Sequence, residues 1–168
     1  VRERMDQARY AEALAELPAA RKAARESGEA ALELDADRLE AEIARHLADR
    51  ERALSAVERG LARAGDAREL FPARAALLVQ RAIVLRRLGQ VEASLRAYAE
   101  ALVIFRRLGI RRSEAFARNG LGGALVASGD LEDAIIAFRA SIQIDRETGD
   151  RLRLGRKLSN VGQVLDAR

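Results

Sequence analysis

Residues 85–109 read LRRLGQVEASLRAYAEALVIFRRLG, and forty positions further on residues 125–149 read LVASGDLEDAIIAFRASIQIDRETG. Both stretches have glycine at their fifth and last positions. Between the glycines, large apolar residues match large ones and small residues match small ones. Self-similarity at a fixed period indicates a repeat protein, in which each unit buries its apolar face against the next unit.

Each repeat reads as a pair of helices. In the earlier of the two repeats, the pattern predicts one helix over residues 73–88 and a second over residues 91–108. Gly89 and Gly109 follow these helices, and a glycine just past a helix end accommodates the left-handed backbone found there. Apolar residues of the second helix recur at intervals of three and four, which places them on one face. The short breaks predict antiparallel neighbours.

The same register extends, less regularly, toward both ends of the chain. The units are a half repeat at 8–28, a degenerate repeat at 31–66, repeats at 73–109 and 113–149, and a half repeat at 151–168. We therefore predict an all-α superhelical solenoid of antiparallel helix pairs, about eight helices in one domain over residues 1–168, with cut repeats at both ends. Pro18 lies in the opening helix, which it should kink or restart.

Composition excludes several classes of function. The chain has no Cys, which rules out disulfides, thiol catalysis and cysteine metal ligands, and the simplest compartment for such a chain is the cytoplasm. No apolar run is long enough to span a membrane. These features favour a cytoplasmic protein that does not enter a membrane.

The charge is unevenly distributed along the chain. Residues 1–70 carry 13 basic and 16 acidic side chains, whereas residues 71–168 carry 17 basic and 10 acidic ones. The densest basic cluster consists of Arg106, Arg107, Arg111 and Arg112. A surface that binds nucleic acid would also need aromatic side chains for base stacking. The few aromatic residues here stand at core spacing, so nucleic acid is disfavoured as a partner.

No pattern predicts catalysis, a cofactor or a metal. His46 is the only histidine, and its neighbours indicate a helix surface without the further ligands that a metal site needs. Residues 120–123 read Gly-Leu-Gly-Gly, but no lysine follows them as it would in a phosphate-binding loop. Because they also lie inside a predicted helix, we interpret these glycines as sites of close helix packing. Glu40 and Glu42 stand among arginines and read as solvated helix charges. We therefore predict that the protein is not an enzyme.

Within each repeat, residues of defined size stand at defined places. The later repeat has Gly122, Ala134, Phe138 and Ser141; the earlier one has Ala82, Ser94, Tyr98 and Ala101. In size and spacing these residues resemble the tetratricopeptide repeat, in which small residues let paired helices approach and an aromatic ring fills the gap between them. The proline that this family places near the end of its second helix is absent. The period of forty is similar to the longer variant in kinesin light chain and in bacterial signalling proteins.

The resemblance implies a concave groove, lined by the first helix of each pair, that binds a polypeptide. The groove positions of the family correspond to Val79, Ile83, Arg86, Phe116, Asn119, Gly123, Val126, Arg156, Ser159, Asn160 and Gln163. Asn119 and Asn160 are the strongest candidates, because an amide side chain can donate to and accept from a peptide backbone simultaneously. Arg156 is suited to a carboxylate.

The resulting hypothesis is a protein-interaction scaffold within a larger bacterial signalling or regulatory protein. Its partner would be a peptide or domain with an acidic or amphipathic segment. Two alternatives stay open: a structural spacer that self-associates into homo-oligomers through exposed solenoid ends, and a nucleic-acid contact through the basic cluster.

Overall fold

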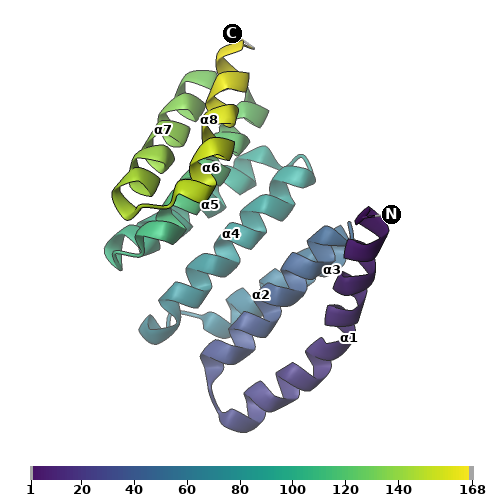
Figure 1. Cartoon of the computed structure of the whole chain (residues 1–168). Helices are drawn as coiled ribbons and strands as arrows, with labels where there is room; N and C mark the ends of the chain where they lie inside the picture. The colour runs from purple at the N-terminus through teal and green to yellow at the C-terminus, as the bar shows by residue number, and fades with distance from the viewer. Residues whose placement is uncertain (1, 167–168) are drawn as a thin grey trace. The chain divides into compact units, whose positions relative to one another are not determined.

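The computed structural model describes the backbone of residues 2–166 and the side chains of residues 7–150 and 157–165. The helices are α1 (Arg2–Ser27), α2 (Ala30–His46), α3 (Arg50–Ala64), a short 3-10 helix (Arg68–Leu70), α4 (Phe71–Arg87), α5 (Val91–Arg107), α6 (Arg111–Ser128), α7 (Leu131–Thr148) and α8 (Arg151–Asp166). Residues 2–166 contain no strand. The predicted all-α fold of helix pairs is confirmed (Figure 1).

The boundaries predicted for the helices at 73–88 and 91–108 agree with α4 and α5 to within two residues, whereas α1 begins six residues before the predicted half repeat at 8–28. Gly129 and Gly149 end α6 and α7 with φ of 90° and 71°, the left-handed conformation that glycine adopts without strain. Pro18 does not restart α1, which is assigned as one continuous helix. Figure 1 shows that α1 changes direction along its length, as expected of a helix with an internal proline.

The chain divides into two compact units, residues 1–84 and 85–168. The first unit contains α1, α2, α3 and most of α4. Its apolar core includes a cluster of Leu34, Ala64, Leu70 and Leu77, which joins α2, α3 and α4. A second cluster is made of small side chains from α2 and α3, Ala41, Ala56 and Val57. Small residues at this contact allow the two helices to lie close together.

The first unit also contains a buried carboxylate surrounded by arginines. Asp37 on α2 is fully buried. It accepts hydrogen bonds from Arg21 of α1 at 2.5 Å, and from Arg59 and Arg63 of α3 at 2.9 and 2.5 Å. A buried carboxylate is stable only when its charge and its lone pairs are satisfied. The three guanidinium groups therefore tie α1 and α3 to the helix between them.

The prediction that Glu40 is a solvated helix charge is wrong. Glu40 is buried, and its carboxylate accepts hydrogen bonds from Arg21, Arg52 and Arg59 at 2.5, 2.8 and 2.6 Å. Burial alone would raise the pKa of Glu40, but the hydrogen bond from Arg52 and the charges of Arg21 and Arg59 outweigh it, so the pKa lies below 4.5. Glu42 does pair locally, with Arg38 one turn away.

The lowered pKa of Glu40 makes the stability of the first unit sensitive to acid. In the unfolded chain the carboxyl regains its ordinary value of 4.5, so ionised Glu40 stabilises the fold above that pH. This contribution is lost as the pH falls through the lower folded pKa. We expect the gap in urea midpoint between wild type and Glu40→Gln to be constant near neutral pH and to shrink below about pH 4.5. A gap that stays constant down to about pH 3 would contradict this assignment.

The second unit contains the end of α4 and helices α5 to α8. The residues that carry the repeat pattern in its later repeat, Gly122, Ala134, Phe138 and Ser141, are all buried. Ser141 donates a hydrogen bond from its Oγ to the backbone oxygen of Ala115 at 2.6 Å, which joins α7 to α6. Phe138 and Ala134 pack with Ile135 and with Val164 of α8 in one apolar cluster. The small–aromatic–small pattern therefore positions α6, α7 and α8 around a common contact.

Candidate functional site

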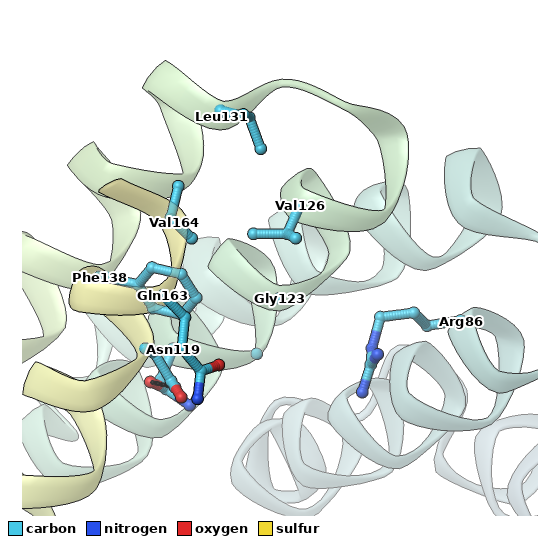
Figure 2. Close-up of a pocket in the computed structure, with 10 residues that line it drawn as sticks. Arg86, Asn119, Gly123, Val126, Leu131, Phe138, Gln163 and Val164 are labelled. Atoms are coloured by element: carbon cyan, nitrogen blue, oxygen red, sulfur yellow. Dashed lines mark hydrogen bonds between the residues drawn. The ribbon is translucent and has the colours of Figure 1, made fainter. Parts of the chain in front are cut away.

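A pocket of about 330 Å³ lies in the second unit, over the apolar contact of α6, α7 and α8. Its lining residues come from four helices: Arg86 from α4, Asn119, Gly120, Gly123 and Val126 from α6, Leu131 and Phe138 from α7, and Asn160, Gln163 and Val164 from α8. Figure 2 shows the pocket with these side chains. The lining combines apolar side chains with several polar ones, and a cavity in which a few polar groups converge among apolar side chains is the usual form of a binding site.

The two asparagines with the strongest sequence-based case meet in this pocket. Asn160 of α8 donates a hydrogen bond from its Nδ2 to the Oδ1 of Asn119 on α6 at 3.1 Å. Both residues are half-buried. The bond uses one of the two N–H donors of Asn160 and one lone pair of Asn119. The remaining donors and acceptors of the pair stay available beside the pocket.

Among the described residues that line the pocket, Arg86 is the one with a charged side chain. Its Nε is buried and has no hydrogen-bond partner among the described residues. Figure 2 shows Arg86 on the other side of the pocket from Asn119 and Gln163 in this view. Because an unpaired buried N–H group costs free energy, this side chain is suited to an acceptor supplied by a ligand.

The sequence predicted only part of the apolar lining of the pocket. Val126 belongs to the predicted set, but Leu131, Phe138 and Val164 do not. Phe138 and Val164 are buried core residues that also reach the pocket. The aromatic position of the repeat pattern identified Phe138 as a packing residue, and no feature of the sequence showed that its ring would also line a cavity.

Arg86, Asn119, Gly123, Val126, Asn160 and Gln163 of the predicted groove are brought together in this pocket. Phe116 and Ser159 are exposed and lie outside its lining. Val79 and Ile83 belong to the first unit, where Val79 is buried and Ile83 is half-buried. Arg156 lies in α8, but its side chain is outside the described residues.

The glycines of α6 fall into two kinds. A Cβ on Gly120 would lie 2.5 Å from the hydroxyl of Tyr98, and one on Gly122 would lie 2.7 Å from the ring of Phe138. Close packing, predicted for this run, is therefore confirmed for these two. A Cβ on Gly123 would meet nothing within 4 Å. Glycine destabilises a helix interior by about 1 kcal/mol relative to alanine, and at Gly123 no contact within the chain offsets this cost.

Two of the four arginines in the basic cluster are engaged with acidic side chains. Glu114, only 3% exposed, lies 2.8 Å from Arg111 and 3.5 Å from Arg106. Arg111 also contacts Glu147 at 2.5 Å. Burial alone would raise the pKa of Glu114, but hydrogen bonds from Arg118 and Arg111 outweigh it and hold the pKa below its ordinary value. Carboxylates thus neutralise part of the surface on which a nucleic-acid contact would depend.

His46 lies on the surface, as predicted, and its ring stacks on Tyr10 of α1 with the ring centres 4.4 Å apart. Within the described residues, no group of three or more histidine, aspartate or glutamate side chains is placed to hold a metal ion. None of the helices in that part of the chain combines the length and apolar character required to cross a membrane.

Residues 73–167 match the family model of the tetratricopeptide repeat. No curated protein matches the chain.

Solved structures of low sequence identity share the fold. BtubC (BKLC) from P. vanneervenii is 21% identical with a TM-score of 0.74, and the match covers 98% of this chain and 66% of that one. The apo form of RapI is 13% identical with a TM-score of 0.76, covering 93% of this chain and 43% of RapI. A Podosopora anserina protein with nearly identical TPR-like repeats is 17% identical with a TM-score of 0.67, covering 96% and 90%. The chain therefore spans less than two thirds of the length of BtubC and of RapI.

Proposed function

Because the chain belongs to the tetratricopeptide repeat family, we propose that its second unit binds a polypeptide segment of a partner protein in the pocket between α6 and α8. In this proposal the protein is a scaffold that performs no chemistry on its partner. The observation that carries it is the hydrogen bond from Asn160 to Asn119 in a pocket that is also lined by apolar side chains.

The bonding capacity of the asparagine pair matches a peptide group. After the mutual hydrogen bond is counted, Asn119 retains both N–H donors of its amide, and Asn160 retains its carbonyl oxygen. A peptide group presents one acceptor and one donor. The pair can therefore donate to the carbonyl and accept from the N–H of a ligand main chain, whatever the side chains of the ligand are.

The rest of the pocket suits an amphipathic or acidic segment. Leu131, Phe138 and Val164 form an apolar surface against which an aliphatic side chain of the ligand can pack. Arg86 supplies a positive charge, and guanidinium groups bind carboxylates through two parallel hydrogen bonds. A partner that combines an aliphatic side chain with a nearby carboxylate would use both features.

The proposal predicts that the double variant Asn119→Ala/Asn160→Ala binds its partner more weakly but remains folded. Two hydrogen bonds to a ligand main chain, each worth about 0.5–1.5 kcal/mol, correspond to roughly a 5- to 150-fold loss of affinity. Because both members of the asparagine pair are removed together, no buried polar group loses its partner and stability should change little. The measurement is the dissociation constant for a protein captured from lysate by the wild-type chain.

Ser159→Ala is the matched control, because Ser159 adjoins Asn160 but is exposed and does not line the pocket. It should bind as wild type does. Equal affinity of the double asparagine variant and the wild type would remove the pocket from the binding surface. That result would favour the alternative of a self-associating spacer. Light scattering over a range of protein concentrations would then detect a molecular mass that rises with concentration.

We further propose that the protein acts in the cytoplasm as an interaction module of a larger bacterial signalling or regulatory protein. The absence of Cys supports the compartment. The partial coverage of BtubC and RapI is what a module of a longer protein would give.

A further inference from the structure

Gly123 differs from the two neighbouring glycines of α6 in having no packing role. Gly120 and Gly122 make room for the rings of Tyr98 and Phe138. Gly123 lines the pocket, and the space in front of its Cα is open. Because Gly123 also lines the pocket, which Gly162 of α8 does not, its missing side chain leaves room for the close approach of a ligand.

The position of Gly123 relative to the polar groups indicates what approaches. Gly123 lies one turn after Asn119 on the same helix, and Figure 2 shows it between Asn119 and Arg86 in this view. A ligand main chain bonded to the asparagine pair and continuing toward Arg86 would pass over this point of α6. A Cβ there would stand in its path.

We infer that Gly123 is a ligand-contact residue, kept free of a side chain so that an extended acidic segment can lay its main chain against α6 and place a carboxylate on Arg86. This inference rests on the proposed function and names its ligand class. The occupant is an internal segment whose carboxylate belongs to an Asp or Glu side chain.

The asparagine pair favours an extended ligand over a helical one. An extended segment exposes the N–H and C=O groups that Asn119 and Asn160 can bind, whereas a helix bonds these groups internally.

The carboxylate is argued from charge complementarity. Arg86 is the charged residue in the described part of the pocket lining, and its buried Nε lacks a partner among those residues. Burying an aliphatic ligand side chain beside this Nε would be unfavourable unless the ligand also supplied an acceptor. A side-chain carboxylate leaves the main chain free to continue in both directions past the asparagine pair.

The test is selection of displayed 12-residue peptides on the full chain, followed by affinity measurements with synthetic copies of the enriched peptide. We expect enrichment of Asp or Glu next to an aliphatic residue. Changing that acid to its amide, or Arg86→Gln in the protein, should each weaken binding tenfold or more, and together no more than either alone. An amidated C-terminus should bind unchanged; a tenfold loss there would assign the carboxylate to a free C-terminus and overturn the side-chain assignment.

Gly123→Ala separates ligand contact from packing. We expect a higher urea midpoint, because alanine favours the helix, together with at least tenfold weaker peptide binding. Gly162→Ala is the matched control: Gly162 also has nothing within 4 Å of its Cβ position but does not line the pocket. It should raise the midpoint and leave binding unchanged. Wild-type affinity of Gly123→Ala would overturn the inference.

The failure of the inference is distinguishable from the failure of the proposed function. Peptides that need Asn119 and Asn160 but tolerate Gly123→Ala and Arg86→Gln would leave the pocket as the binding site and refute this ligand class. Failure to enrich any peptide on the wild type over the double asparagine variant would overturn both.

Discussion

Replacing Lys157 with alanine should lower the free energy of unfolding by about 3–5 kcal/mol, the usual cost of removing one partner of a buried ion pair. Lys157 on α8 and Asp145 on α7 are 5% and 3% exposed, and their charged atoms lie 2.6 Å apart. Neither atom has a regular hydrogen bond to a described residue. Asp145 would therefore keep a buried charge with no compensating partner. Chemical denaturation followed by circular dichroism would measure the loss.

The chain offers a matched control in its only other lysine. Lys22 also pairs with a carboxylate, Glu26, but at 3.8 Å and with both side chains about two-thirds exposed or more. Exposed pairs of this kind contribute about 0–1 kcal/mol, so Lys22→Ala should be nearly neutral. The double variant Lys157→Met/Asp145→Leu should recover most of the loss, because an apolar pair of similar volume removes the orphaned charge. Equal effects of the two lysine substitutions would show that the Lys157 pair is not buried in solution.

The Lys157 pair also bears on binding, because α8 carries Asn160, Gln163 and Val164 of the pocket. When the pair is broken, the described part of α8 loses this charged contact with α7 and keeps the apolar contacts of Val161 and Val164. Peptide affinity of Lys157→Ala should therefore fall even at temperatures where the chain remains folded. This makes Lys157 a positioning residue for the pocket, although it does not line it.

The repeat pattern was sufficient to predict the helix pairs of the regular repeats, and it explains one contact that was not predicted. Helix ends followed from glycines that recur at a fixed spacing, because backbone conformation at a helix end depends on local residues. The period of forty also placed Asn119 and Asn160 at almost equivalent positions on successive first helices. Equivalent positions on stacked units are neighbours in a repeat protein, and the two side chains are indeed hydrogen-bonded.

The ionic contacts could not be predicted from the sequence. Local spacing identifies partners three or four residues apart on one helix, and the pair of Glu42 with Arg38 is of this kind. The partners of Glu40 include Arg21, which is 19 residues away. Whether a glutamate faces solvent or a neighbouring helix depends on how its own helix is rotated about its axis in the packed unit. The repeat at 31–66 is too degenerate to predict that rotation.

The pocket itself was predicted only in part for a similar reason. Its polar residues stand at groove positions of the repeat, so their clustering followed from the resemblance. A Cβ on Gly123 would have no neighbour within 4 Å, and this depends on how the surrounding side chains pack, which the sequence pattern does not specify. Two adjacent glycines, Gly122 and Gly123, look alike in sequence, yet one faces the ring of Phe138 and the other faces the cavity.

Asp37→Ala should lower the free energy of unfolding by several kcal/mol, because it removes three hydrogen bonds between charged groups, each worth about 1.5–3 kcal/mol. Asp37 is fully buried and accepts from Arg21, Arg59 and Arg63. Of the described side chains on α1, only Leu17 and Ala24 are buried. Apolar contact therefore contributes little to holding α1 in place, and the ionic contacts of Arg21 contribute much of the rest. The expected result is faster amide exchange in α1 together with a lower urea midpoint.

Asp35→Ala is the control that separates burial from charge. Asp35 lies two residues earlier on the same helix, but its side chain is 53% exposed and contacts only the half-buried Arg38 at 3.1 Å among the pairs described. The two substitutions remove the same side chain and the same charge from α2. A solvated ion pair contributes about 0–1 kcal/mol, so Asp35→Ala should leave both the midpoint and α1 exchange near wild type. If Asp37→Ala behaved in the same way, the arginines would be interacting with water instead of the carboxylate. Helix α1 would then be held by its other contacts, which include Leu17, Ala24 and the stacking of Tyr10 on His46.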